Sequence, residues 1–198
     1  AAETAPYGQV LQELLTPASA LSSNKRGVSV VLLRVRDWLR ELPSDRTQSI
    51  DHLRTYLEKT VHEFVRAMRT HRGHASVETL LVLCPSYRYS TPDEKALLAQ
   101  TESELLENLK GVPGLQVVVA SAFHPHYKVN EDDVEDALRD EIAHIPYQDA
   151  YLHTLATLVI RHVHRRLAPL RKVVVVDCDN TLWRGVVGEV GPHGIAFD

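Results

Sequence analysis

The chain has 198 residues, of which 44% are hydrophobic and 24% charged, and its 22 basic and 26 acidic side chains give a formal net charge of -4. This composition is that of a folded globular protein and excludes disordered, collagen-like and disulfide-rich secreted chains. The acidic excess argues against a strongly basic nucleic-acid binder. No apolar stretch approaches the roughly 20 residues of a membrane span. We therefore expect neither nucleic acid nor membrane as a partner.

The cysteines and the first residues bear on the compartment. Cys84 and Cys178 each lie within an apolar run, as reduced thiols of a protein core do. The opening AAETAPYGQV lacks the basic and apolar regions of a secretory signal. We expect a cytoplasmic protein.

The secondary structure is taken in chain order. Residues 1–27 are typical of a helix around 10–15 followed by a loop. Short Val-rich runs, typical of strands buried on both faces, occupy residues 28–35, 80–84, 116–120 and 173–176. Helical patterns lie between these runs over residues 50–68, 91–111 and 151–167. The second pattern opens with the capping box TPDE at Thr91.

Strands that alternate with helices imply parallel, right-handed crossovers. We therefore expect an α/β fold, a three-layer α/β/α sandwich with a mainly parallel, Rossmann-like sheet. Ligands of such sheets bind at the carboxyl ends of the strands. Those ends fall at residues 34–38, 84–87, 121–126 and 177–183.

The sharpest chemical signal is the run KVVVVDCDNTLW at residues 172–183. Asp177 and Asp179 follow the last apolar run two positions apart, so both carboxylates can reach one Mg²⁺ while an oxygen remains free to attack phosphorus. The alternative is a strand that ends in an Asx turn without chemistry.

This run resembles the first motif of the haloacid dehalogenase (HAD) superfamily of phosphotransferases. Over residues 172–195 the sequence is similar to the narrower FkbH-like branch, subfamily IIIC, except at Val190, where that branch usually has Asp. Weaker similarity upstream, in VVLLRVRDWLR, LLVLCP and HIPYQDAYLHTLATLVIR, looks like the region before the HAD domain in FkbH-like units of nonribosomal peptide and polyketide synthases.

The resemblance implies roles for residues of the motif. Asp177 is the phosphoryl-accepting nucleophile, Asp179 is the general acid and base, and both are Mg²⁺ ligands. Thr181 holds the motif turn, and the substrate-binding residues are Asn180, Thr181 and Trp183.

The resemblance also implies a reaction. FkbH-like members take a glyceryl unit from 1,3-bisphosphoglycerate, remove phosphate and leave the acyl group as a thioester on a carrier protein. The partners are then an acyl or peptidyl carrier protein with phosphopantetheine and the neighbouring synthase domains. Cys178 is either a transient acyl-thioester nucleophile or a buried residue that points away from the carboxylates.

A working HAD enzyme needs later motifs that do not follow within these 198 residues. By resemblance, residues 1–170 form an SGNH-like domain and residues 171–198 the first strand and loop of a HAD domain, and we expect this chain alone to be inactive. We expect the strand at 173–176 to be captured by the edge of the upstream sheet or by a second copy. Residues 177–198 then form an extended or irregular tail without a Mg²⁺ site.

A second constellation is DEIAHIPYQDAYL at residues 140–152. It resembles the Asp and His block of SGNH hydrolases, with His144 as base and Asp140 as its partner, although the spacing is one residue too long and Glu141 fits it better. No GDS block with a nucleophilic serine follows any of the expected strands, so the candidate nucleophile is Ser86. His144 is otherwise a buried, hydrogen-bonded anchor of its loop. The alternatives to glyceryl transfer are thus an esterase, favoured by exposed polar groups around His144, and a noncatalytic scaffold or docking domain, favoured by an apolar or flat surface there.

Overall fold

The computed structural model describes residues 3–42, 49–87, 89, 91–169, 173 and 175–197, without the side chain of Glu41. These residues divide into two compact units, Ala1–Leu167 and Ala168–Asp198. The expected domain division after residue 170 lies outside the described residues, and so does Lys172 of the aspartate motif. The SGNH-like and HAD assignments stay predictions. None of the described helices is long and apolar enough to cross a bilayer.

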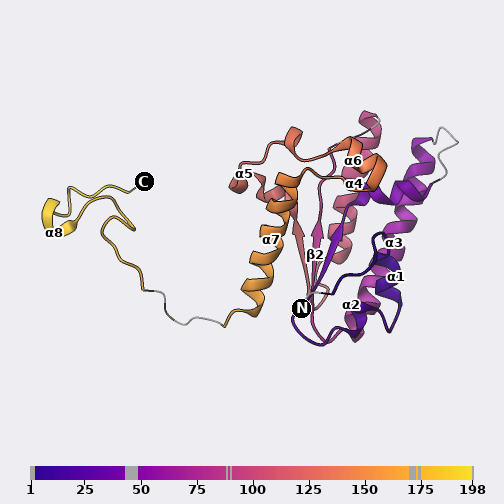
Figure 1. Cartoon of the computed structure of the whole chain (residues 1–198), viewed down its shortest axis with the longest axis horizontal. Helices are drawn as coiled ribbons and strands as arrows, with labels where there is room; N and C mark the ends of the chain where they lie inside the picture. Colours follow the sequence, from indigo (N-terminus) through magenta and orange to yellow (C-terminus); the bar gives the residue numbers. More distant parts are fainter. Residues whose placement is uncertain are drawn as a thin grey trace. The chain divides into compact units, whose positions relative to one another are not determined.

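A parallel sheet forms the centre of the first unit (Figure 1). Its strands are β1 (Val28–Leu33), β2 (Glu78–Leu83) and β3 (Leu115–Val119), in the spatial order β1-β2-β3. Val30 pairs with Leu80, and Leu81 pairs with Val117. Runs of Val and Leu suit strands that are covered on both faces.

Three helices cover one face of this sheet: α1 (Val10–Leu15), α3 (Ile50–His74) and α4 (Pro92–Leu109). Sheet and helix side chains form one buried cluster that includes Val31, Leu33, Leu81, Leu83, Leu57, Phe64, Leu97 and Leu105. The capping box is confirmed at Thr91, whose hydroxyl accepts a hydrogen bond from the backbone N–H of Glu94 at 3.1 Å. Helix α3 continues beyond the predicted pattern of residues 50–68 and includes Gly73.

Helix α7 (Asp149–Leu167) covers the other face. Its buried side chains belong to a second cluster, which includes Leu80, Val82, Val118, Tyr151, Leu155 and Leu158. With helices on both faces of a parallel sheet, the expected three-layer α/β/α sandwich is confirmed.

Short helical segments join these layers. They are α2 (Ala20–Ser23), η1 (Val35–Glu41), η2 (Ala120–Phe123), α5 (His124–Tyr127), η3 (Glu131–Asp133) and α6 (Ala137–Ala143). Because η1 follows β1 and η2 follows β3, these two segments lie at the carboxyl ends of the strands, where a parallel sheet presents its ligand site.

The second unit contains no strand at the last apolar run. Val173, Val175 and Val176 carry no strand pairing in the described part of the chain, and Val175 is 91% exposed, while Val174 lies outside the described residues. The described residues of this run therefore do not form the expected strand, and its capture by the edge of the upstream sheet or by a second copy stays a prediction. Four apolar residues do not form a strand without a neighbour that accepts their backbone hydrogen bonds.

The rest of the second unit is more folded than the expected tail. It contains the short helix α8 (Val187–Val190) and an antiparallel bridge between Arg184 and Ala196, with N···O distances of 2.7 and 3.1 Å. This bridge closes the segment into a loop.

Candidate functional site

The aspartate motif forms a tight turn, here called the aspartate loop, at residues 177–187. The carbonyl oxygen of Cys178 accepts hydrogen bonds from the backbone N–H groups of Thr181 at 3.2 Å and Leu182 at 2.9 Å. Asn180 adopts a left-handed conformation with φ of 56°, which Asn tolerates better than most residues. Its Oδ1 accepts a hydrogen bond from the backbone N–H of Gly185 at 2.9 Å.

Asp179 is held through one of its two carboxylate oxygens. Its Oδ1 accepts hydrogen bonds from the indole N–H of Trp183 at 3.1 Å and from the backbone N–H of Val187 at 3.2 Å. Among the described residues, no donor contacts Oδ2. The carboxylate therefore has one bound oxygen and one available oxygen.

Asp177 and Cys178 are both exposed. The expectation of a buried Cys178 is wrong, because the run before it forms no strand and leaves the thiol in solvent. Neither side chain makes a hydrogen bond or ion pair within the described part of the chain. Both are accessible to a reacting group, and their catalytic roles stay predictions.

The residues expected to bind substrate have partners inside the loop. Trp183 is half-buried, and its ring packs edge-on against Phe197 with 6.0 Å between centroids and 70° between planes. Asn180 and Trp183 both direct polar atoms to neighbours in the loop. Thr181 supports the turn through its backbone, while its side chain is exposed. Substrate contact by these residues stays a prediction.

The donor set of the loop suits Mg²⁺, which is commonly bound by one or two carboxylates and completed by water and phosphate oxygens. Asp177 and the Oδ2 atom of Asp179 supply such oxygens. The described residues contain no group of three His, Cys, Asp or Glu side chains that could hold a metal ion. The loop thus offers two carboxylates of a site that other ligands must complete.

At the carboxyl ends of the strands in the first unit, Arg34 organises a largely buried ionic cluster. Its side chain, only 3% exposed, donates from Nη2 to both oxygens of Asp140 at 3.0 and 3.1 Å and from Nε to Asp37 at 2.9 Å. Arg40 also contacts Asp140. Oε1 of Glu135 lies 3.5 Å from Nη1 of Arg34. We call these five residues the Arg34 cluster.

The contacts of the cluster change the pKa values of its members. Burial alone would lower the pKa of Arg34, but hydrogen bonds to Asp37 and Asp140 raise it above its ordinary value. Burial alone would raise the pKa of Asp140, but hydrogen bonds from Arg34 and Arg40 hold it below its ordinary value. The charged form of each partner is therefore stabilised by the other.

The expectation that His144 is buried is wrong. His144 is exposed and ends α6 in a left-handed conformation with φ of 55°, which turns its ring away from the core. The ring stacks on Tyr7 with centroids 6.1 Å apart, and Nδ1 contacts Arg40. Exposed polar groups around His144 would by themselves favour an esterase, but this ring is bound to a cation and not to a carboxylate.

The residues considered for a hydrolase triad are not joined. Ser86 donates its hydroxyl to Glu135 at 3.3 Å, and the carboxylate of Asp140 binds arginines. Within the described residues, no side-chain hydrogen bond links Ser86, His144 and Asp140. A Ser-His-Asp relay requires one hydrogen bond between serine and histidine and another between histidine and aspartate.

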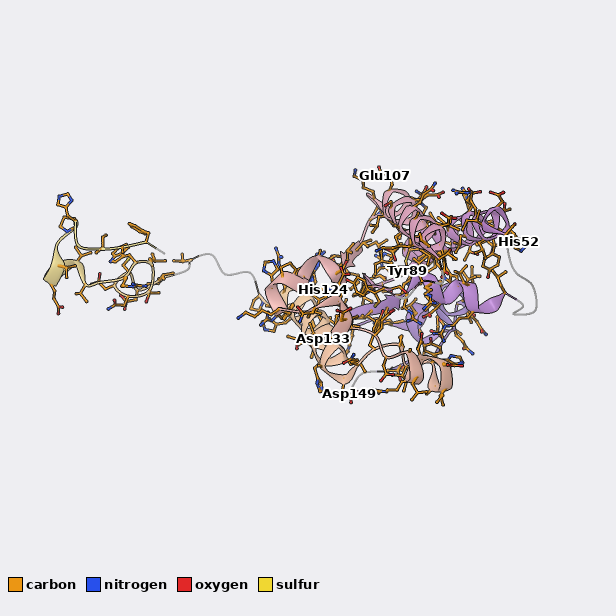
Figure 2. The ribbon with its side chains drawn as sticks, turned by 90° about the horizontal axis from the view of Figure 1, so that it is seen from above. His52, Tyr89, Glu107, His124, Asp133 and Asp149 are labelled. Atoms are coloured by element: carbon orange, nitrogen blue, oxygen red, sulfur yellow. The ribbon has the colours of Figure 1, made fainter. Side chains whose placement is uncertain are left out.

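Sequence reasoning missed the environment of His124. Figure 2 labels His124 among the side chains of the first unit. The two ring nitrogens of His124 lie 3.2 Å from the hydroxyl of Tyr87 and 3.1 Å from the hydroxyl of Tyr151. Burial lowers the pKa of His124 and raises that of Tyr87 to about 12. His126, two positions further along the same helix, is exposed and does not share this buried environment.

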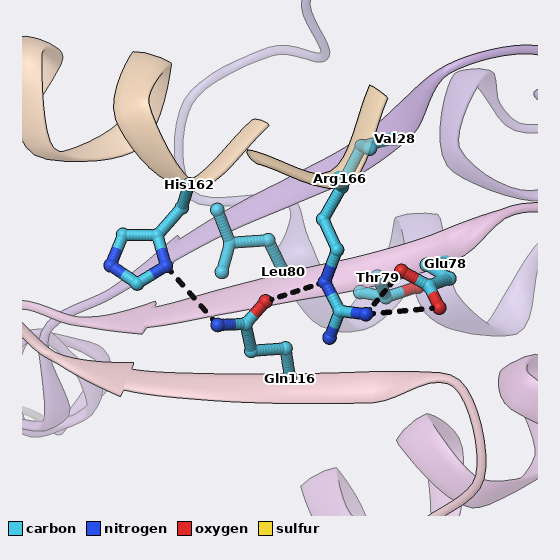
Figure 3. A pocket seen from close by; sticks show the side chains of 7 residues that line it. All are labelled: Val28, Glu78, Thr79, Leu80, Gln116, His162 and Arg166. Atoms are coloured by element: carbon cyan, nitrogen blue, oxygen red, sulfur yellow. Dashed lines mark hydrogen bonds and ion pairs between the residues drawn. The ribbon is translucent and has the colours of Figure 1, made fainter. Parts of the chain in front are cut away.

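At the amino ends of the strands, polar contacts fasten α7 to the sheet (Figure 3). Gln116 lies 3.1 Å from Nδ1 of His162 and accepts a hydrogen bond from Nε of Arg166 at 2.9 Å. Arg166 also pairs with Glu78 at 3.1 Å. His162 and Arg166, near the end of α7, therefore contact the sheet.

The chain is similar in fold to a solved structure. No family model and no curated protein matches the sequence. The fold is similar to the crystal structure of the N-terminal part of the protein BF1531 from Bacteroides fragilis, which contains a phosphatase domain and is complexed with Mg; the TM-score is 0.65 and the sequence identity 17%. The match covers 96% of this chain and 51% of that chain, so this chain spans about half the length of the structure that it matches. At this identity the likeness shows that the two chains share a fold.

Proposed function

We propose that the polypeptide carrying this sequence is a HAD-type, phosphatase-related enzyme of FkbH-like kind. It takes a glyceryl unit from 1,3-bisphosphoglycerate, releases phosphate and leaves the acyl group as a thioester on a phosphopantetheinyl carrier protein in the cytoplasm. The observation that carries the proposal is the aspartate loop, which presents the exposed Asp177 beside an Asp179 fixed at one oxygen. The fold shared with a structure that contains a phosphatase domain and Mg supports it.

Each side chain of the loop has a role in this proposal. The exposed carboxylate of Asp177 accepts the phosphoryl group, and Oδ2 of Asp179 gives a proton to the leaving oxygen and later takes one from water. Asp177 through a carboxylate oxygen and Asp179 through its backbone carbonyl oxygen would hold Mg²⁺, which supplies neutralising charge next to the phosphate. Oδ2 of Asp179 then stays free for proton transfer. The exposed thiol of Cys178 attacks the acyl carbon and releases the C1 phosphate, and the thioester then passes to the carrier thiol, while the phosphoryl group that Asp177 accepts is the one at O3 of the glyceryl unit.

The experiment uses the polypeptide as its natural gene encodes it, with Mg²⁺, 1,3-bisphosphoglycerate and a phosphopantetheinylated carrier. We expect orthophosphate release and, in the intact mass of the carrier, the addition of one glyceryl unit. Asp177→Asn should leave the 3-phosphate in place, so that the carrier gains a 3-phosphoglyceryl unit and only the C1 phosphate is released, and Cys178→Ser should abolish loading. Phosphate release that depends on Asp177 without any loading would reject glyceryl transfer and retain the coarser phosphatase function.

The 198-residue chain is the matched control. Because its described residues offer only two carboxylates for the site, we expect no hydrolysis of a phosphate ester above background. A Mg²⁺-dependent phosphatase activity of this chain that Asp177→Asn removes would contradict that expectation.

A second candidate function concerns the first unit, which we propose to act as a scaffold that docks carrier proteins or neighbouring synthase domains. The Arg34 cluster favours it over an esterase, because it engages Asp140 at the strand ends where a hydrolase needs a free catalytic group. The chain should then hydrolyse p-nitrophenyl acetate no faster than its Ser86→Ala and His144→Ala variants. A rate that either variant abolishes would restore the esterase.

A further inference from the structure

We infer that Trp183 is a positioning residue that fixes the carboxylate of Asp179, so that Oδ2 is the oxygen presented to a reacting group. The inference rests on the proposed function, which makes Asp179 the general acid and base. It assigns to Trp183 a task inside the loop, separate from contact with substrate.

The first step is the asymmetry of the Asp179 carboxylate. The terminal torsion of an Asp side chain is broad and nearly two-fold, so a free carboxylate exchanges its two oxygens readily. Here two N–H donors converge on one oxygen: the indole of Trp183 at 3.1 Å and the backbone of Val187 at 3.2 Å. Exchanging the oxygens would break both hydrogen bonds, so these donors select which oxygen stays available.

The second step is that the indole is itself held in place. Trp183 packs edge-on against Phe197, and its backbone N–H lies 3.4 Å from the carbonyl oxygen of Cys178. Phe197 directly follows Ala196, and the backbone bridge between Ala196 and Arg184 holds Phe197 beside the indole ring of Trp183. A donor that is held on both sides fixes its acceptor, as a supporting residue does for a catalytic group.

The third step separates the N–H group from the ring. Trp and Phe both supply an aromatic ring for the contact with Phe197, but only Trp carries an N–H donor. Trp183→Phe therefore removes the hydrogen bond to Asp179 while it keeps an apolar ring in the loop.

The first test is spectroscopic and does not depend on any activity. The chain has two tryptophans, Trp38 and Trp183, so an amide correlation spectrum of the 198-residue chain contains two indole signals. Trp183→Phe assigns them. We expect Asp179→Ala to shift the Trp183 indole signal, while Asp177→Ala, two positions away, leaves it in place and Trp38 serves as the internal reference. An indole signal that does not respond to Asp179→Ala, or that responds equally to Asp177→Ala, would overturn the inference.

The second test measures release of the 3-phosphate by the natural-length polypeptide. Loss of orientation lowers the rate of the chemical step, so Trp183→Phe should lower kcat on the order of tenfold to a hundredfold with KM nearly unchanged. Trp38→Phe, which changes the other tryptophan in the first unit, should leave both constants unchanged. An unchanged kcat in Trp183→Phe would overturn the positioning role.

The two tests separate this inference from the proposed function. If Asp177→Asn retains full release of the 3-phosphate, the proposed function fails and the positioning role falls with it. If Asp177→Asn abolishes release of the 3-phosphate while Trp183→Phe keeps kcat, the inference alone fails. The Asp179→Ala measurement reads the native tryptophan, so it remains decisive even where Trp183→Phe disrupts the loop.

Discussion

Arg34 shows how one buried side chain can organise the end of a parallel sheet. Its guanidinium binds Asp37 in the segment after β1 and Asp140 in α6, and it lies close to Glu135 and over the ring of Tyr147. Asp140 is 106 positions away in the sequence. A cation buried among carboxylates is costly to remove, because its partners are left without compensation.

Replacing Arg34 by Ala should therefore destabilise the first unit by about 3–5 kcal/mol, the usual cost of breaking a buried pair by removing one partner. Lys59→Ala is the control, since Lys59 and its partner Glu63, 3.8 Å away, are both exposed; it should cost less than about 1 kcal/mol. Urea unfolding followed by circular dichroism measures both. Equal losses in the two variants would show that the cluster contributes no more than a surface pair.

The Asp140 carboxylate should make the free energy of unfolding depend on pH in the acid range. Its pKa in the folded state is lowered by Arg34 and Arg40, so its contribution is complete above the unfolded value of about 3.9 and is lost as the pH falls from there through the folded value. Asp140→Asn should lower stability at pH 7 and flatten the acid limb of the urea midpoint. Glu141→Gln, at an exposed neighbour, should leave that limb as steep as in the original chain.

At the scale of elements, His124 joins three segments of the first unit. The ring belongs to α5, Tyr87 lies in the segment after β2, and Tyr151 lies in the first turns of α7. A neutral imidazole has one donor and one acceptor nitrogen, which the two hydroxyls can satisfy together. The neutral ring is therefore the form that links these elements.

Stability should consequently fall as His124 becomes protonated. Burial lowers its pKa in the folded state, so its contribution is present above the unfolded value of about 6.5 and is lost as the pH falls below that value. One such proton gives a slope of at most about 1.4 kcal/mol per pH unit. His124→Gln should reduce the slope of unfolding free energy between about pH 7 and pH 5. His126→Gln, at an exposed position of the same helix, should retain the full slope.

The elements that sequence predicted well are those fixed by local signals. The capping box set the start of α4, and Val-rich runs located β1, β2 and β3, because these patterns depend on neighbours in the chain. The run at 173–176 has the same composition, but its described residues pair with no strand, and composition alone does not show whether a strand has a neighbour to pair with. The Arg34 cluster and the tyrosines around His124 were missed because their members are brought together by the fold.

At the scale of the whole chain, the hydrophobic core belongs to the first unit. Every buried hydrophobic side chain of the described residues lies between Leu14 and Leu158. The described part of the second unit is held by turn hydrogen bonds and by the contact between Trp183 and Phe197. The free energy of unfolding of the first unit should then be independent of the residues after Leu167.

A chain that ends at Leu167 should therefore unfold at the same urea midpoint as the 198-residue chain, because the truncation removes no buried core side chain. Near-ultraviolet circular dichroism of Trp38 can follow the transition in the shorter chain, which lacks Trp183. A midpoint that falls on truncation would show that the second unit stabilises the first. A chain that ends before α7 should fail to fold, since it loses the helix that covers one face of the sheet.

The order β1-β2-β3 also has a consequence for synthesis. Each strand is added beside the one made before it, so the sheet and its first helical layer are complete in sequence once Val119 has left the ribosome. The opposite face, with Leu80, Val82 and Val118, stays uncovered until α7 has emerged up to Leu167. At roughly 5–20 residues per second this interval lasts about 2–10 s. During those seconds the nascent chain presents an apolar sheet face that a ribosome-associated chaperone can recognise, and translation speed between β3 and α7 sets how long it does so.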